Sequence, residues 1–243
     1  MKRSLEILVV LAAFATMAFS QKAASPPVAA KPAATAASTP LDVAKAAIVA
    51  HGGEKFQHMK SLLVMGTVDI TGAFSQVIPA TFRFITSGDR YMLELNNPIS
   101  PLKQVFDGKQ KYSSGYELPP MTSLGFPLLP RAGDTGYTVT ALPDAKKKKK
   151  GFRITTPDGF YTDYFVDDKT GQIKGYESSY DVNGRTATTS VEIDEFQTVE
   201  GVMVPKKYSQ RFDLGDLTAY ASFNTKQILV NSAIADDVFV VAK

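Results

Sequence analysis

The sequence predicts a mainly β protein of the α+β class. We expect an unclosed antiparallel β-barrel, or strongly curved meander, of about 11 to 12 strands. An N-terminal helix and a short helical or loop lid should cap it. Three observations predict this fold: helical signals end near residue 60, β-branched and aromatic runs follow, and tight-turn residues separate most of these runs. A sheet of that width must curl or close.

The N-terminus has the pattern of a secretory signal peptide, residues 1–20. Lys2 and Arg3 precede an apolar run over 7–19, and Ala18-Phe19-Ser20 has the small-x-small form of a cleavage site. The run is shorter than the roughly 20 residues of a permanent membrane span. The sequence contains no Cys, which excludes a disulfide framework, a thiolate metal site and a lipidated cysteine. We expect an exported protein that is soluble after cleavage, periplasmic in a diderm bacterium.

Residues 21–40 are rich in Ala and Pro and contain no aromatic side chain. Such a segment buries too little apolar surface to order itself, so it is predicted to be a disordered tether. It is either a passive remnant or a spacer that reaches another envelope component. The folded domain is expected over 41–243.

The first helix of that domain is predicted from its cap. Thr39-Pro40-Leu41-Asp42 has the form of a capping box with Pro at the first helical position. An Ala-rich stretch follows over 43–50, and Gly52-Gly53 is typical of a helix end. A short second turn is expected over 54–60.

Twelve runs then have strand character. Residues 165–176 form the clearest turn between two of them, with Gly171 at the position that needs positive φ. The spacing of the acidic residues there does not match a calcium loop, so we expect a hairpin. The predicted strands are 62–70, 77–86, 91–95, 103–106, 109–113, 137–142, 152–156, 160–166, 172–180, 186–196, 202–212 and 217–228.

The segment 116–136 breaks this pattern. It is strongly apolar, yet its four prolines exclude a central strand or a long helix. It is predicted to be a loop or a short helical lid, with Met121, Leu124, Phe126 and Leu128 as its apolar contacts. A plug that only covers the open end of the sheet is the alternative.

Motifs for catalysis or metal binding are missing from the sequence. The two histidines, His51 and His58, lie outside any metal-ligand spacing. Both should be structural, with His51 as a cation in the last turn of the helix. No nucleophile elbow, phosphate-binding loop or dinucleotide fingerprint occurs. We therefore expect a protein that is not an enzyme and has no cofactor and no metal.

Strand alternation instead predicts an apolar concavity. Phe82 and Phe84 share one strand face, and Tyr91, Leu93 and Leu95 share another. These five residues are the candidate ligand-binding wall, although simple core packing is the safer interpretation for any single one of them.

Charge adds one further candidate surface. The chain has 27 Lys and Arg against 24 Asp and Glu, and the run from Lys146 to Lys150 exceeds the net charge of +3. A single basic spot does not predict nucleic-acid binding, which needs a basic face. Lys146, Lys147, Lys148, Lys149 and Lys150 are expected in a solvated loop that folding does not require, or in a site that docks on anionic headgroups.

Four segments resemble the outer-membrane lipoprotein-sorting proteins of the LolA/LolB-like superfamily. They are VFDGKQKY (105–112), YFVDDKTGQIKGYE (164–177), VEGVMVPKKY (199–208) and DDVF (236–239), and the resemblance covers nearly all of 41–243. It implies an unclosed barrel, capped by helices, that accommodates acyl chains without catalysis. The Ala/Pro tether and the lysine run depart from the carrier, and the absence of Cys departs from the anchored receptor.

Two functional hypotheses follow. The first is a carrier for acyl chains of lipids or lipoproteins in lipoprotein sorting or envelope lipid handling, with peripheral membrane contact and an inner- or outer-membrane protein as possible partners. The second is a structural or regulatory envelope module whose barrel is filled by its own side chains and whose surface binds a protein. The sequence leaves open the ligand, the partner and the oligomeric state.

Overall fold

The computed structural model describes residues 38–72, 76–114, 118–143, 146, 149–182 and 184–240. The predicted signal peptide and nearly all of the predicted tether lie outside these residues. Within them, no helix combines the length and the apolar character needed to cross a membrane.

The first helix, α1 (Pro40–Ala50), begins at the capping box that the sequence predicts. The Asp42 N–H donates to the Thr39 side-chain oxygen at 3.2 Å, and the Thr39 N–H donates to the Asp42 carboxylate at 3.0 Å. The described helix therefore begins one residue before the expected domain start at 41. A single further turn, α2 (Glu54–Gln57), follows Gly52 and Gly53.

In the part of the chain that the structure describes, twelve antiparallel strands form one open sheet, which confirms the predicted fold class. The first half comprises β1 (Ser61–Thr71), β2 (Val77–Ser87), β3 (Arg90–Asn96), β4 (Leu102–Phe106) and β5 (Lys111–Ser113). The second half comprises β6 (Thr138–Thr140), β7 (Gly151–Thr155), β8 (Tyr161–Val166), β9 (Ile173–Val182), β10 (Arg185–Val199), β11 (Val202–Leu214) and β12 (Leu217–Val230).

The order of the strands joins two meanders. Neighbours run from β5 through β1, then from β12 back to β6, so that β1 pairs with β12 at the centre of the sheet. The two edge strands, β5 and β6, are consecutive in the chain. The insert between them must therefore pass from one edge of the sheet to the other, across its opening. It forms η1 (Met121–Ser123), α3 (Gly125–Leu128) and η2 (Leu129–Arg131), the short helical lid that the prolines predict.

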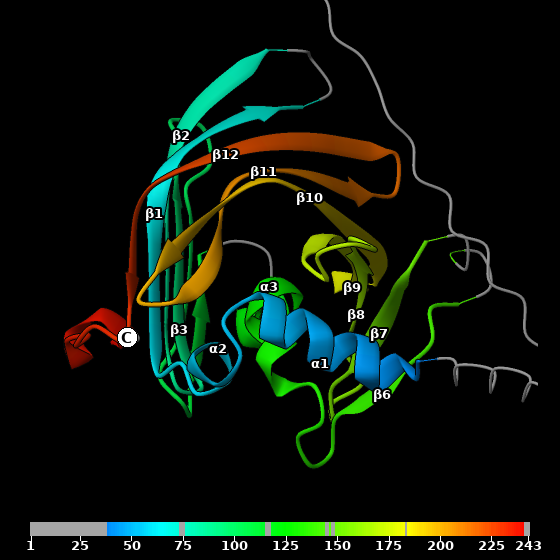
Figure 1. The fold of residues 1–243 in the computed structure, drawn as a ribbon. Coiled ribbons are helices and arrows are strands. Elements are labelled where there is room, and N and C mark those ends of the chain that lie inside the picture. The colour runs from blue at the N-terminus through cyan, green and yellow to red at the C-terminus, as the bar shows by residue number, and fades with distance from the viewer. Residues whose placement is uncertain are drawn as a thin grey trace, which may run out of the picture. The chain divides into compact units, whose positions relative to one another are not determined.

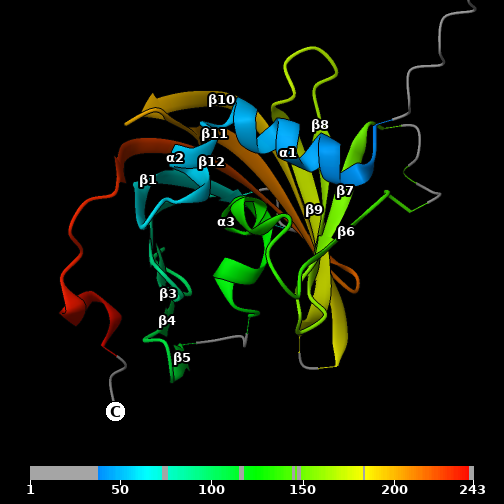
Figure 2. The same ribbon diagram turned by 60° about the horizontal axis from the view of Figure 1, so that its bottom comes forward.

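The sheet bends into an arch. In Figure 1, β1 to β3 form one limb and β6 to β9 the other, with β10 to β12 curving between them; α1 and α3 lie inside the arch. Figure 2 shows the same helices on the concave side of the strands. The last helical turn, η4 (Asp236–Phe239), lies outside the first limb, where Phe239 packs on Ile85, Met92 and Val105.

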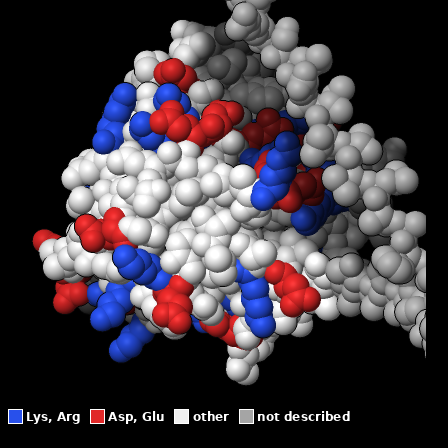
Figure 3. Space-filling view, in the orientation of Figure 1, with Lys and Arg blue, Asp and Glu red and all other residues white. Residues whose placement is uncertain are grey.

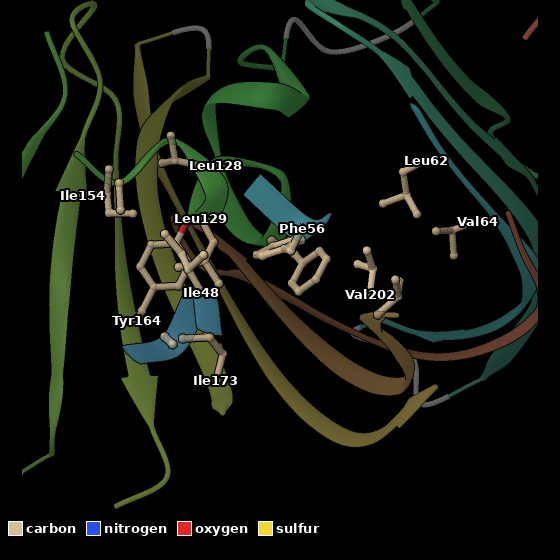
Figure 4. Close-up of a cluster of buried hydrophobic side chains, with 14 of the residues drawn as sticks. Ile48, Phe56, Leu62, Val64, Leu128, Leu129, Ile154, Tyr164, Ile173 and Val202 are labelled. Atoms are coloured by element: carbon tan, nitrogen blue, oxygen red, sulfur yellow. The ribbon is translucent and has the colours of Figure 1, made fainter. Parts of the chain in front are cut away.

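The main core joins both limbs, and α1 and the insert pack into it under the second limb. Figure 4 shows Ile48 of α1 close to Leu129, Tyr164 and Ile173, whereas Leu62 and Val64 project from β1, on the far side of Phe56. The helix and the insert thus fill the space beneath β6 to β9. They cover the concave face of the first limb less completely.

The hairpin at 165–176 is a turn, as its sequence predicts. Gly171 has φ of 73°. The Asp167 carboxylate accepts hydrogen bonds from the backbone N–H groups of Lys169 and Thr170, both at 2.9 Å, and pairs with Lys174. The acidic side chain at the turn is thus used to hold the loop. Among the described residues, no group of three His, Cys, Asp or Glu side chains is placed to hold a metal ion.

His51 joins the end of α1 to the sheet. Its Nδ1 lies 3.0 Å from the Met203 carbonyl oxygen, and its Nε2 accepts from the Ile173 N–H at 3.1 Å. Burial lowers the pKa of His51, although the hydrogen bond with Met203 opposes this shift. The expectation of a cation at this position is wrong: the imidazole is fully buried and neutral, because Nε2 must remain an acceptor.

We predict that the free energy of unfolding declines as the pH falls from 7 to 5.5. The folded pKa of His51 lies below the ordinary value of 6.5, so the unfolded chain binds the proton more tightly. The stabilisation is therefore complete above 6.5 and is lost below it, with a slope of up to about 1.4 kcal/mol per pH unit. Carboxylates with lowered pKa act only at more acidic pH, below roughly 4.5.

Urea unfolding at several pH values measures this slope. His51→Gln should reduce it, and the exposed His58→Gln should retain it. An unchanged slope in His51→Gln would show that another group carries the pH dependence.

Candidate binding cavity

A cavity of about 440 Å³ lies on the concave side of the sheet, under the arch. The first limb supplies one wall, which includes Val68, Phe82, Phe84, Leu93, Leu95 and Leu102. Strands β9 to β12 supply the opposite wall, which includes Tyr176, Ser178, Tyr180, Thr189, Tyr208 and Gln210. The insert closes one side with Leu118, Met121, Leu124, Gly125, Phe126 and Pro127.

The first wall is entirely apolar because of strand register. Phe82 lies opposite Leu95 and Phe84 opposite Leu93 across β2 and β3, so all four side chains project from one face. Phe82 also packs edge-on against Phe223 of β12, with ring centroids 5.0 Å apart. The aromatic contacts continue across β12 to β11.

The second wall combines aromatic and polar groups. The Tyr208 ring stacks on Phe223 at a centroid distance of 4.6 Å and an interplanar angle of 9°. Gln210 donates a hydrogen bond from Nε2 to the Thr189 hydroxyl oxygen at 2.6 Å. Burial raises the pKa of Tyr180 to about 12, and burial also raises the pKa of Tyr208. Both phenols therefore stay protonated at neutral pH.

No Lys, Arg, Asp, Glu or His is found among the described residues that line this cavity. Figure 3 shows the face of the molecule that is turned to the viewer in Figure 1. Charged side chains gather toward the margins of this face, with none over its centre. The cavity can therefore take an apolar guest with uncharged polar groups. The polar part of its described lining consists of Ser, Thr, Tyr and Gln side chains.

The structure brings four of the five predicted wall residues to the cavity. Phe82, Phe84, Leu93 and Leu95 line it. Tyr91 lies on the same strand face as Leu93, but it is fully buried where β3 contacts η1, and its ring packs near Phe106 at 5.9 Å. Its assignment to the cavity wall is wrong, because alternation gives the face of a side chain and not what covers it.

The predicted lid residues divide in the same way. Met121, Leu124 and Phe126 line the cavity. Leu128, one helical turn from Leu124, is fully buried in the main core and faces away from the cavity. Leu128 holds the insert on the core and has no part in the lining.

Sequence reasoning missed the second wall. Tyr208, Gln210 and Phe212 alternate with more polar or charged neighbours along β11, as do Tyr176, Ser178 and Tyr180 along β9. That alternation was available in the sequence. Its polar members conceal the inward face, because Ser, Thr and Gln are usually assigned to the solvent side of a strand.

Gly125 fastens the insert to the second limb. Its N–H donates to the Thr162 hydroxyl at 3.1 Å, and its carbonyl oxygen accepts from the Tyr164 hydroxyl at 2.6 Å. It has φ of 59°, and an added Cβ would lie 2.7 Å from the Tyr176 ring. Only glycine combines this backbone conformation with so close an approach.

The lysine run is only partly a free surface. Lys146 donates to buried Asp163 at 2.9 Å and also pairs with Glu177. Arg153 binds the same Asp163 carboxylate through two hydrogen bonds, at 2.6 and 2.9 Å. Burial alone would raise the pKa of Asp163, but the hydrogen bonds from Arg153 and Lys146 outweigh it and lower the pKa. Lys147 and Lys148 lie outside the described residues.

Lys149 and Lys150 differ from Lys146 in being exposed. Lys149 lies 4.3 Å from the centroid of the Phe165 ring, and Lys150 makes a 3.6 Å ion pair with exposed Asp168. Docking of the run on anionic headgroups stays a prediction, and Lys149 and Lys150 are the described residues available for it. Lys146 differs from them in its contacts with Asp163 and Glu177, and the expectation that folding does not require the run stays a prediction.

We predict that Lys146→Met lowers the free energy of unfolding by about 1 kcal/mol, because one hydrogen bond to a buried carboxylate is lost while Arg153 keeps the other bonds. Lys150→Met is the matched control, since its pair is exposed and should contribute little. Urea unfolding at pH 7 measures both. Equal losses would mean that the Lys146 contacts are not stabilising.

We further predict that Gly125→Ala destabilises the protein more than Gly88→Ala. Both glycines have φ of 59°, but the space around Gly88 is open. The two variants should therefore differ in free energy of unfolding by about 1 to 3 kcal/mol, the cost of overpacking against Tyr176. Similar losses in the two variants would show that the insert shifts without cost.

The sequence matches no family model and no curated protein. Solved structures do resemble it. A LolA superfamily protein from Nitrosomonas europaea aligns with a TM-score of 0.52 at 12% identity, over 84% of this chain and 99% of that one. A DUF1329 family protein from Desulfovibrio piger gives 0.49 at 10% identity, over 84% and 98% of the two chains.

A third structure, a domain named for outer membrane lipoprotein sorting from Vibrio parahaemolyticus, gives a TM-score of 0.45 at 12% identity, over 82% of this chain and 95% of that one. The first alignment spans almost the whole of its partner and carries the comparison. The arch, its inner helix and its insert together form a LolA-like fold.

Proposed function

We propose that this chain is a binding or carrier protein for the acyl chains of lipids or lipoproteins. It would act without catalysis in the periplasm, in lipoprotein sorting or envelope lipid handling. The observation that carries the proposal is the cavity of about 440 Å³ with no charged side chain in its described lining. The LolA-like fold, shared with the LolA superfamily protein from Nitrosomonas europaea, supports it.

The chemistry of the cavity suits an alkyl chain. Each methylene transferred from water to an apolar site contributes about 0.8 kcal/mol, so a chain lying along the Phe84 and Leu93 wall would gain affinity with its length. The volume lies within the range typical of small-molecule sites. A charged headgroup would stay outside, because no described lining residue offers a compensating charge.

The insert would control access. Met121, Leu124 and Phe126 contribute side chains to the cavity, while Gly125 is held by hydrogen bonds to Thr162 and Tyr164. Opening by movement of the whole insert would break these bonds. Rotation of the apolar side chains around a fixed Gly125 would not.

Binding of a fluorescent acyl probe tests the proposal. We predict that Phe84→Glu and Leu93→Glu each weaken binding at least about tenfold, because a carboxylate on this wall would have to be desolvated as the chain enters. Thr81→Glu is the control. Thr81 is exposed on β2, the strand that carries Phe84, and this variant should bind normally.

Circular dichroism would first establish that the variants fold. Folded variants with undiminished affinity would rule out this wall as the binding site. A wild-type protein that takes up no probe but co-purifies with one protein partner would favour the structural module instead.

A further inference from the structure

The wall formed by β9 to β11 carries hydrogen-bonding groups that an alkyl chain does not need. Thr189 on β10 lies opposite Ser178, and Tyr180, two residues along β9, is its diagonal neighbour. On β11, Gln210 is the next diagonal neighbour and Tyr208 follows it on the same face. We call Tyr180, Thr189, Gln210 and Tyr208 the polar stripe; it crosses three strands and faces the apolar wall of β1 to β4.

The polar stripe keeps unused hydrogen-bonding capacity. The Tyr180 and Tyr208 hydroxyls make no hydrogen bond to any residue that the structure describes. The Thr189 oxygen accepts from Gln210, which leaves the Thr189 hydroxyl proton without an acceptor among the described residues. Ser178 makes no hydrogen bond with Thr189, and its hydroxyl pairs instead with that of Thr162 at 2.8 Å.

These groups are mainly neutral donors. Burial holds the pKa of both phenols above the ordinary value, so they keep their protons at neutral pH. Unused donors at the surface of a mostly apolar cavity are costly unless a ligand or water accepts from them. The complementary ligand group is an uncharged acceptor, such as the carbonyl oxygen of an ester or an amide.

Resting on the proposed function, we infer that the polar stripe binds the carbonyl groups that link acyl chains to their headgroup. The ligand class is thereby narrowed to acyl esters and amides, whose linkage enters the cavity while the charged head stays outside. An ionised carboxylate at the same depth would lose its hydration and would gain hydrogen bonds from neutral donors only. An ionised free fatty acid therefore fits less well.

A pair of lipids isolates this interaction. Short-chain phosphatidylglycerol with two ester-linked chains and its dialkyl ether analogue have the same head and the same chain length, and they differ in two carbonyl oxygens. Titration calorimetry below the micellar concentrations gives an affinity for each. The wild-type protein should bind the diester about tenfold more tightly, as expected for two hydrogen bonds from neutral donors.

Tyr180→Phe/Tyr208→Phe should abolish most of this preference by lowering the affinity for the diester. Both hydroxyls lack a partner within the described protein, so their removal should not cost stability. Tyr161→Phe is the matched control, because Tyr161 lies on the outer face of β8 under Arg153 and should keep the preference. Thr189→Val, compared with Thr188→Val on the opposite strand face, tests the stripe through a second residue.

The outcomes separate the two proposals. Equal binding of both lipids by the wild type, or a preference that survives in both stripe variants, would overturn the inference and leave the acyl-chain function standing. Failure to bind either lipid would overturn both.

Discussion

The concave face of the twelve-stranded sheet must be shielded from water, and the described chain has few residues outside the strands with which to do so. Helix α1 and the insert fill the second limb. The first limb keeps apolar side chains such as Phe84 and Leu93 at the edge of an open volume. A closed barrel of this size would fill its interior or leave a symmetrical channel. In the open arch, α1 and the insert fill the space under the second limb, and the cavity remains beside the first limb.

Two sets of buried polar contacts, at His51 and at Gly125, hold α1 and the insert against the sheet. The His51 imidazole satisfies one backbone donor and one backbone acceptor, from strands β9 and β11. Its ring also lies near Phe56, Phe126 and Phe196, so α1, the insert and β10 meet around it. Gly125 fastens the insert to β8 through its hydrogen bonds with Thr162 and Tyr164. The inner helix and the insert are thus fastened to strands β8, β9 and β11 beside the cavity.

Much of the fold could be predicted from local sequence. Turn residues such as Gly171 and the capping box at Thr39 act over a few residues, so the strands and the helix start are readable one at a time. The pairing of β1 with β12 was not readable, because no local signal links segments at opposite ends of the domain. The cavity was half predicted for the same reason. Alternation brought Phe84 and Leu93 to its lining, but the covering of Tyr91 and the ion pairs of Lys146 depend on distant segments.

The central pairing of β1 with β12 has a consequence for folding. Strand β1 cannot pair with β12 until β12, the last strand, has been synthesised and released. The loop-closure entropy of this pairing is therefore large and the contact order high. Until then β1 presents an unpaired edge on one side. A chain built in this way gains little from folding as it emerges, and it stays open to aggregation until its C-terminal part is free.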